Sequence, residues 1–142
     1  MKLLICLLLT SSLALSYAKL QTARATGQLV CAGVPVRFAN VTIWEKDTMD
    51  PDDKFGTVKT DIRGHFDISM EESEITKIKP YLVITHKCNA KHDNCHREST
   101  FNIPEKYVFE KAKTPHEPWN AGKIELHVDA RDGDKRICDK KN

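Results

Sequence analysis

The residues best suited to chemistry lie close together in the middle of the chain. Two cysteines and three histidines fall within one short stretch: His86, Cys88, His92, Cys95 and His96. Thiolate sulfur and imidazole nitrogen are the ligands of tetrahedral zinc sites. The spacing of these two cysteines, however, is not the C-x-x-C spacing typical of such sites. An oxidising compartment would join the cysteines in disulfides instead, so the compartment decides between the two chemistries.

The N-terminus predicts the compartment. Lys2 is followed by an unbroken apolar run over residues 3–9, and small residues at positions 16 and 18 precede Lys19. This order is typical of a cleaved secretory signal peptide. The run is too short for a transmembrane helix, which needs about 20 apolar residues. We therefore expect a signal peptide over residues 1–18, a secreted extracellular product, and no membrane-spanning segment.

The remaining residues, 19–142, are enough for one domain with a single core. The whole chain carries 22 basic and 20 acidic residues, a formal net charge of +2. No basic block or alternation of basic and aromatic residues is present. This balance argues against a nucleic-acid partner.

Removal of the signal peptide makes the cysteine count even. The chain has five cysteines, and Cys6 leaves with the signal peptide. Cys31, Cys88, Cys95 and Cys138 remain, so we predict two disulfides with three connectivities open. We favour Cys88–Cys95, because a short polar turn separates them, and this leaves Cys31–Cys138. With all four cysteines paired, no thiolate is left for zinc or for a nucleophile, and we expect no metal.

Short runs of β-branched, aromatic and alternating apolar residues predict strands along the whole domain. The expected strands are residues 27–31, 36–44, 55–60, 65–69, 81–85, 96–103, 107–109 and 123–128. Residues 61–64 have the composition of a hairpin turn. Residues 71–74 are a polar connection that could form one helical turn. In the last strand, Ile124, Leu126 and Val128 should face the core.

No amphipathic helix is long enough to cover a sheet. We therefore predict an all-β fold, a two-sheet antiparallel β-sandwich of seven to eight strands with at most one short helical turn.

Two further features could be sites. Asn40-Val41-Thr42 is an N-glycosylation sequon, and alternation places Asn40 on the outer face of its strand. The acidic loop over residues 47–53 offers oxygen ligands for calcium. It lacks the ligand order of an EF-hand, so we interpret it as a solvated turn.

The ordered motifs of the chain resemble those of the nematode transthyretin-like proteins. The resemblance covers nearly all of the mature chain, at residues 27–31 (GQLVC), 40–47 (NVTIWEKD), 50–53 (DPDD), 60–66 (TDIRGHF), 79–88 (KPYLVITHKC), 95–97 (CHR), 103–104 (IP) and 107–108 (YV).

The resemblance implies a prealbumin-like sandwich in a secreted family whose molecular roles are mostly undefined. Some relatives are similar to extracellular bridging factors that bind exposed phospholipid and a cell-surface receptor on dying cells. We therefore expect a non-enzymatic binding protein, a monomer or weak dimer without a cofactor. Its ligand would be extracellular, a phospholipid or a cell-surface receptor.

Two alternatives remain. Related 5-hydroxyisourate hydrolases use a His/Arg/His set and a C-terminal Tyr-Arg-Gly-Ser, whereas this chain ends in RICDKKN. His65, His86, His116 and His127 match no catalytic role, so no catalytic residue is predicted. A carrier of small hydrophobic molecules would require a tetramer with a suitable channel.

Overall fold

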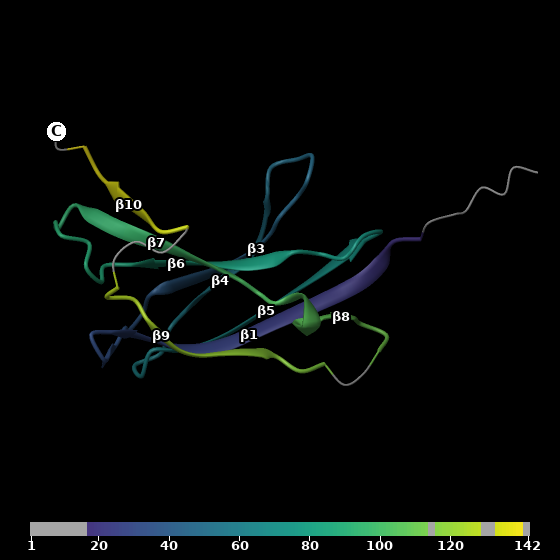
Figure 1. The fold of residues 1–142 in the computed structure, drawn as a ribbon, viewed down its shortest axis with the longest axis horizontal. Helices are drawn as coiled ribbons and strands as arrows, with labels where there is room; N and C mark the ends of the chain where they lie inside the picture. The colour runs from purple at the N-terminus through teal and green to yellow at the C-terminus, as the bar shows by residue number, and fades with distance from the viewer. Residues whose placement is uncertain (1–16, 114–115, 129–132, 141–142) are drawn as a thin grey trace, which may run out of the picture.

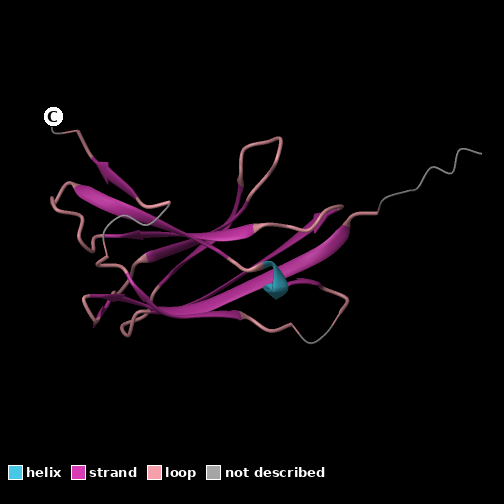
Figure 2. Ribbon diagram, viewed as in Figure 1, coloured by secondary structure: helices cyan, strands magenta, loops and turns pink. Residues whose placement is uncertain are grey.

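The protein folds as two stacked β-sheets (Figures 1 and 2). The computed structural model describes residues 17–113, 116–128 and 133–140. The predicted signal peptide lies outside these residues, apart from its last two positions. Each sheet has five strands, so the predicted β-sandwich is confirmed. Among the described residues, the one helical element is the 3₁₀ turn η1 (Glu105–Tyr107).

The first sheet is built around one long strand. β1 (Lys19–Cys31) pairs with every other strand of this sheet: β2 (Val34–Pro35), β5 (His65–Glu74), β8 (Val108–Glu110) and β9 (Trp119–Glu125). All of these pairings are antiparallel except β1 with β9, which is parallel.

The second sheet has the order β10-β7-β6-β3-β4 and is antiparallel throughout. Its strands are β3 (Asn40–Glu45), β4 (Asp53–Lys59), β6 (Pro80–His86), β7 (Cys95–Asn102) and β10 (Lys135–Cys138).

The polar residues 71–74 are strand, so the prediction of a connection or helical turn there is wrong. β1 begins at Lys19, well before the predicted start, and pairs Lys19 with Glu74 and Thr22 with Glu71. These partners satisfy the backbone groups of a segment whose composition alone favours a loop. The helical turn lies instead at η1.

Both disulfides differ from the favoured pairing, which is therefore wrong. Cys31 is bonded to Cys88, with Cα atoms 5.8 Å apart, and Cys95 is bonded to Cys138. The ladder between β6 and β7 ends at the pair His86–Arg97, so Cys88 and Cys95 never become cross-strand neighbours. Cys88 turns inward and is 7% exposed. Cys31–Cys88 therefore links the two sheets, and Cys95–Cys138 ties the edge strand β10 to β7.

The core lies between the inner faces of the two sheets. Fully buried side chains come from both of them, among them Leu29 in the first sheet and Ile43 and Leu82 in the second. Ile124 and Leu126 are buried as predicted. Val128 is 42% exposed, because β9 ends at Glu125 and the chain then leaves the sheet.

The segments that connect the strands lie at the two ends of the sandwich. Residues 32–39, 60–64 and 87–94 lie at the end that carries Cys31–Cys88, which we call the disulfide end (Figure 1). Residues 46–52, 75–79 and 103–107 lie at the opposite end. No helix in the described part of the chain is long and apolar enough to cross a membrane.

Gly64 is the glycine on which the β4–β5 turn depends. Its φ is +79°, and a Cβ there would lie 2.4 Å from the carbonyl oxygen of Leu29. We expect Gly64→Ala to lower the free energy of unfolding by about 3 kcal/mol, because backbone strain and a steric clash add. Gly33 is the matched control, since its φ is +80° but its surroundings are open. Gly33→Ala should cost only about 1 kcal/mol in the same urea titration. Equal losses would contradict the clash.

Candidate functional site

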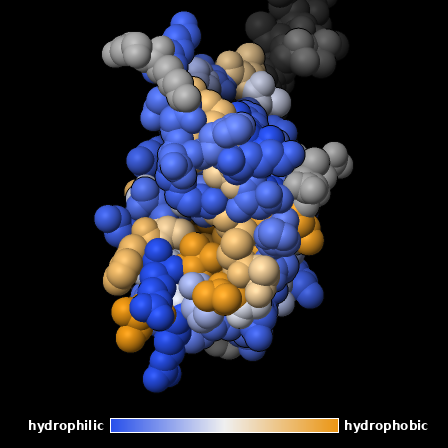
Figure 3. Space-filling view, turned by 90° about the vertical axis from the view of Figure 1, so that its left-hand side faces the viewer, coloured by the Kyte–Doolittle hydropathy of each residue, from blue (hydrophilic) through white to orange (hydrophobic). Residues whose placement is uncertain are grey.

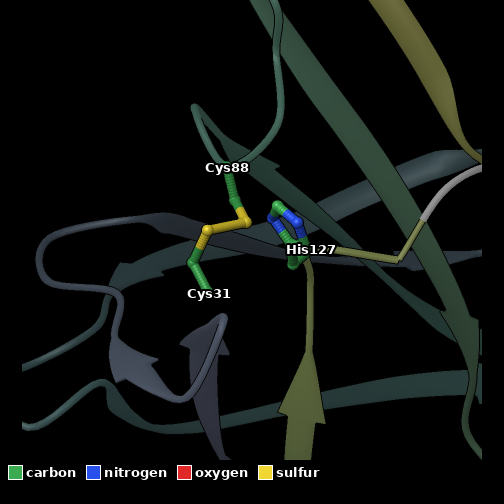
Figure 4. Close-up of side chains that lie close together, drawn as sticks. All are labelled: Cys31, Cys88 and His127. Atoms are coloured by element: carbon green, nitrogen blue, oxygen red, sulfur yellow. A yellow bond between two sulfur atoms is a disulfide. The ribbon is translucent and has the colours of Figure 1, made fainter.

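His127 is the residue that lies beside the inter-sheet disulfide. Cys31, Cys88 and His127 offer donor atoms within 4.8 Å of one another at the disulfide end (Figure 4). The two sulfur atoms are bonded to each other, so they are not the thiolates that a zinc site needs. The zinc site that was weighed and rejected for the stretch around Cys88 and Cys95 would need free thiolates, and these cysteines belong to two different disulfides.

A buried guanidinium organises the chain next to this disulfide. The side chain of Arg97 is 4% exposed and donates to the carbonyl oxygens of Cys88, Leu126 and Val128, at 3.3, 2.8 and 3.1 Å. It also pairs with the carboxylate of Asp134, at 2.5 Å. A buried charge is tolerated when it is paired and hydrogen-bonded, and this guanidinium has an ion pair and three hydrogen bonds to carbonyl oxygens. Arg97 therefore has a structural role.

The neighbouring His86 is unsuited to acid–base catalysis. It is 4% exposed, and its Nε2 lies 2.9 Å from the hydroxyl oxygen of Ser99. Burial, helped by the positive charge of Arg97, lowers the pKa of His86 to about 4. A general base must reach a substrate and should titrate near the working pH, and this imidazole does neither.

The other histidines that were weighed for catalysis occupy separate settings. His65 lies 3.6 Å from Asp61 in a turn, and His127 lies beside the disulfide. His116 stacks on Phe109 and contacts the carbonyl oxygen of Glu110. Among the described residues, these three rings share no hydrogen bond or ion pair with one another. His86 does lie close enough to Arg97 and His96 for their charges to act on it, but both His86 and Arg97 are buried.

The acidic loop meets further carboxylates that the sequence did not associate with it. Tyr81 donates to Asp52 at 2.6 Å, which fixes the loop against β6. Burial and repulsion by Glu45, with further repulsion by Glu74, raise the pKa of Glu72 to about 7. The pairing of β5 with β1 carries Glu72 to this end of the molecule.

Asn40, the predicted glycosylation site, is exposed at the start of β3, and its use remains a prediction.

The disulfide end also carries an exposed apolar patch that sequence reasoning missed. Val34, Phe38 and Ile62 are 65%, 61% and 63% exposed. The space-filling view in Figure 3 faces this end and shows apolar side chains gathered in its lower part, with hydrophilic side chains around them. Arg37 and Arg63 are exposed in the same two loops. We call these five residues the end patch.

Hydrogen bonds hold the two loops of the end patch together. Phe38 donates its backbone N–H to the carbonyl oxygen of Thr60 at 3.1 Å, and the Thr60 hydroxyl donates to the carbonyl oxygen of Val36 at 2.6 Å. Phe38 has a φ of +57°, a conformation that few bulky residues adopt. Its exposed ring is thus presented on an unusual but well-anchored backbone. Residues 37 and 38 form a turn although they were expected within the strand 36–44, so of the two dipeptides only Ile62-Arg63, in the predicted turn 61–64, was an available sequence signal.

Comparison with known proteins gives one consistent result. The model of the transthyretin-like family matches residues 26–104. Transthyretin-like protein 16 of Caenorhabditis elegans is 42% identical over 103 residues, which are 72% of this chain and 78% of the relative. Transthyretin-like protein 5 of the same organism is 37% identical over 139 residues, 97% of this chain and 99% of the relative.

One solved structure is also similar, a 9R-lipoxygenase from Cyanothece. The similarity has a TM-score of 0.40 at 17% identity, and it covers 75% of this chain and 16% of the lipoxygenase.

Removal of the Arg97 guanidinium should be strongly destabilising. Arg97→Met would leave the Asp134 carboxylate without its buried partner, so we expect a loss of about 3–5 kcal/mol in urea unfolding. Arg24→Met is the control, because Arg24 and Asp67 form an ion pair whose side chains are 55% and 51% exposed. That variant should cost about 1 kcal/mol or less. A comparable loss in the two variants would refute the structural role of Arg97.

The titration of Glu72 predicts a pH-dependent stability. The pKa of the Glu72 carboxyl is raised in the folded chain. Its contribution to the free energy of unfolding is therefore complete below about pH 4.5 and is lost progressively as the pH rises to about 7. Glu72→Gln should remove that loss. At pH 8 we expect the variant to be more stable than the parent by at least about 1 kcal/mol, after allowance for solvent screening.

Thermal unfolding of both proteins from pH 4 to pH 8 would measure the effect. Glu71→Gln is the control, because Glu71 is exposed and pairs with Lys111 at 2.8 Å. We expect Glu71→Gln not to stabilise the protein at any pH in this range. A Glu72→Gln variant that differs from the parent equally at every pH would exclude the raised pKa.

Proposed function

The chain belongs to the transthyretin-like family, and from this premise we propose that it is a secreted, non-enzymatic binding protein whose end patch docks on an anionic phospholipid surface. The end patch is the observation that carries the proposal. The predicted signal peptide supports secretion, and two disulfides suit an oxidising compartment. A role outside the cell also agrees with what the resemblance implied.

The composition of the end patch favours a membrane as the partner. Three large apolar side chains are exposed at the disulfide end, Val34 on the short strand β2 and Phe38 and Ile62 in turns, where they could enter the boundary between headgroups and acyl chains. Arg37 and Arg63 flank them in sequence and are exposed. A basic side chain near an anionic leaflet contributes about 1 kcal/mol of attraction. Apolar insertion and charge attraction would therefore act at one surface.

The nearest acid of the turn is already engaged with the backbone. The Asp61 carboxylate accepts hydrogen bonds from the backbone N–H groups of Arg63 and His65, both at 2.8 Å. These bonds hold the pKa of Asp61 below its usual range and orient the carboxylate toward its own turn. The guanidinium groups of the end patch are then available to face phosphate.

The direct test is sedimentation with vesicles of phosphatidylcholine alone or mixed with phosphatidylserine. The protein should come from the medium of a secreting cell line, with Lys19 as its first residue. We expect binding to the mixed vesicles that weakens as salt rises. Phe38→Asn keeps a residue that tolerates positive φ while it removes the ring, and it should weaken binding about tenfold or more.

The matched control changes apolar side chains at the opposite end. Met49 and Ile75 are 95% and 62% exposed, so Met49→Ser with Ile75→Ser removes similar surface outside the end patch. This variant should bind mixed vesicles like the parent. Equal binding to both kinds of vesicle, or none, would overturn lipid docking. Capture by a cell-surface ectodomain that Phe38→Asn abolishes would assign the end patch to a receptor instead.

A further inference from the structure

A cleft of about 400 Å³ opens at the end of the molecule opposite the end patch. It lies where the chain leaves β3, enters β6 and leaves β7. Its lining combines two chemistries, three lysines and a small apolar surface: Lys46, Lys77, Lys79, Ile78, Pro80 and Ile103. Its volume lies within the range of about 300–1,000 Å³ typical of small-molecule sites.

Backbone hydrogen bonds fix the walls of this cleft. Ile103 donates its N–H to the carbonyl oxygen of Pro80 at 3.0 Å, and Lys46 donates its N–H to the carbonyl oxygen of Lys79 at 3.2 Å. Lys79 in turn donates its N–H to the buried carboxylate of Glu45 at 3.0 Å. The three lining segments are thus joined to one another, so ligand binding would lose little conformational entropy in ordering them.

The charge of the lining selects the sign of the ligand. All three lysines are exposed, so their ammonium groups can turn toward a bound group. Glu105 is the one carboxylate of the lining, and it pairs with Lys77 at 3.3 Å. The lining itself therefore has two positive charges in excess, and Glu45 behind it is 5% exposed, with its carboxylate bound to the backbone N–H of Lys79. An anionic head would form charge-assisted hydrogen bonds with the ammonium groups and compete with Glu105 for Lys77.

The apolar part of the lining selects the rest of the ligand. Ile78 and Ile103 are 2% and 5% exposed, so they close the floor of the cleft toward the core but offer a ligand little surface, and the aliphatic parts of the three lysine side chains supply the rest of the apolar lining. A purely inorganic anion would contact only the ammonium groups and leave the aliphatic part of the lining in contact with water. We propose that the cleft binds a small amphipathic anion, with a carboxylate, sulfate or phosphate head on the lysine ammonium groups and an apolar body along the aliphatic lining of the cleft.

Calorimetric titration with sodium decanoate tests this site. We expect saturable binding of one decanoate per chain. Decanol has the same chain without the charge, and sulfate has charge without the chain. Each should bind at least about tenfold more weakly than decanoate, because each satisfies only one part of the lining. Decanol that binds as tightly as decanoate would refute the role of the lysines, and absence of decanoate binding would refute the site.

Variants locate the binding in the cleft. K46Q/K77Q/K79Q should weaken decanoate binding about tenfold or more, whereas K54Q/K59Q/K135Q, which removes three exposed lysines elsewhere, should leave it unchanged. Asn102 lines the cleft and is exposed, so Asn102→Trp should obstruct the site without disturbing the core. Decanoate affinity that is unchanged in both cleft variants would overturn the proposal. Vesicle binding depends on the other end of the molecule, so the two proposals can fail separately.

Discussion

The buried guanidinium of Arg97 is the contact on which the disulfide end depends. It joins three chain segments that no strand pairing holds together: the turn after β6, the chain that leaves β9, and the approach to β10. Carbonyl groups at strand ends would otherwise face an apolar interior without donors, and each would be costly to bury. One side chain with five N–H donors in a planar fork satisfies several of them and Asp134 together. The Cys31–Cys88 disulfide then crosses the sheets beside a segment already fixed.

Because Arg97 and the disulfide fix the chain inside the sandwich, the exposed loops at its two ends can carry side chains suited to binding. The end patch projects from two turns whose backbones are tied to Leu29, Val36 and Thr60, so Phe38 and Ile62 can be exposed without loosening the core. At the opposite end, carboxylates and lysines are interleaved at the strand ends. Glu45 accepts from the backbone of Lys79, and Glu72 lies close enough to Glu45 for their charges to repel. One fold thus presents an apolar, basic end and a strongly charged end.

Much of the fold could be predicted because the local alternation of apolar residues matches the burial that the packed sheets impose. Val41, Ile43, Phe66 and Ile68 alternate along their strands, and all of them are buried as their period requires. The errors lie where a partner strand overrides composition. Residues 71–74 contain three glutamates, yet β1 provides their hydrogen-bond partners. All four residues of β10 are exposed and show no apolar alternation, so only its ladder with β7 and its disulfide identify it.

The sequence by itself determined the class of fold, the family and the presence of four cysteines available for pairing, because composition and motif order are local properties. The tertiary structure alone decided which cysteines pair, since that depends on where the β6–β7 ladder stops and on the inward turn of Cys88. It alone assembled the end patch from two separate turns and the lysine cleft from three strand ends. These surfaces join residues far apart in the chain, and only the packing of one sheet on the other brings such residues together.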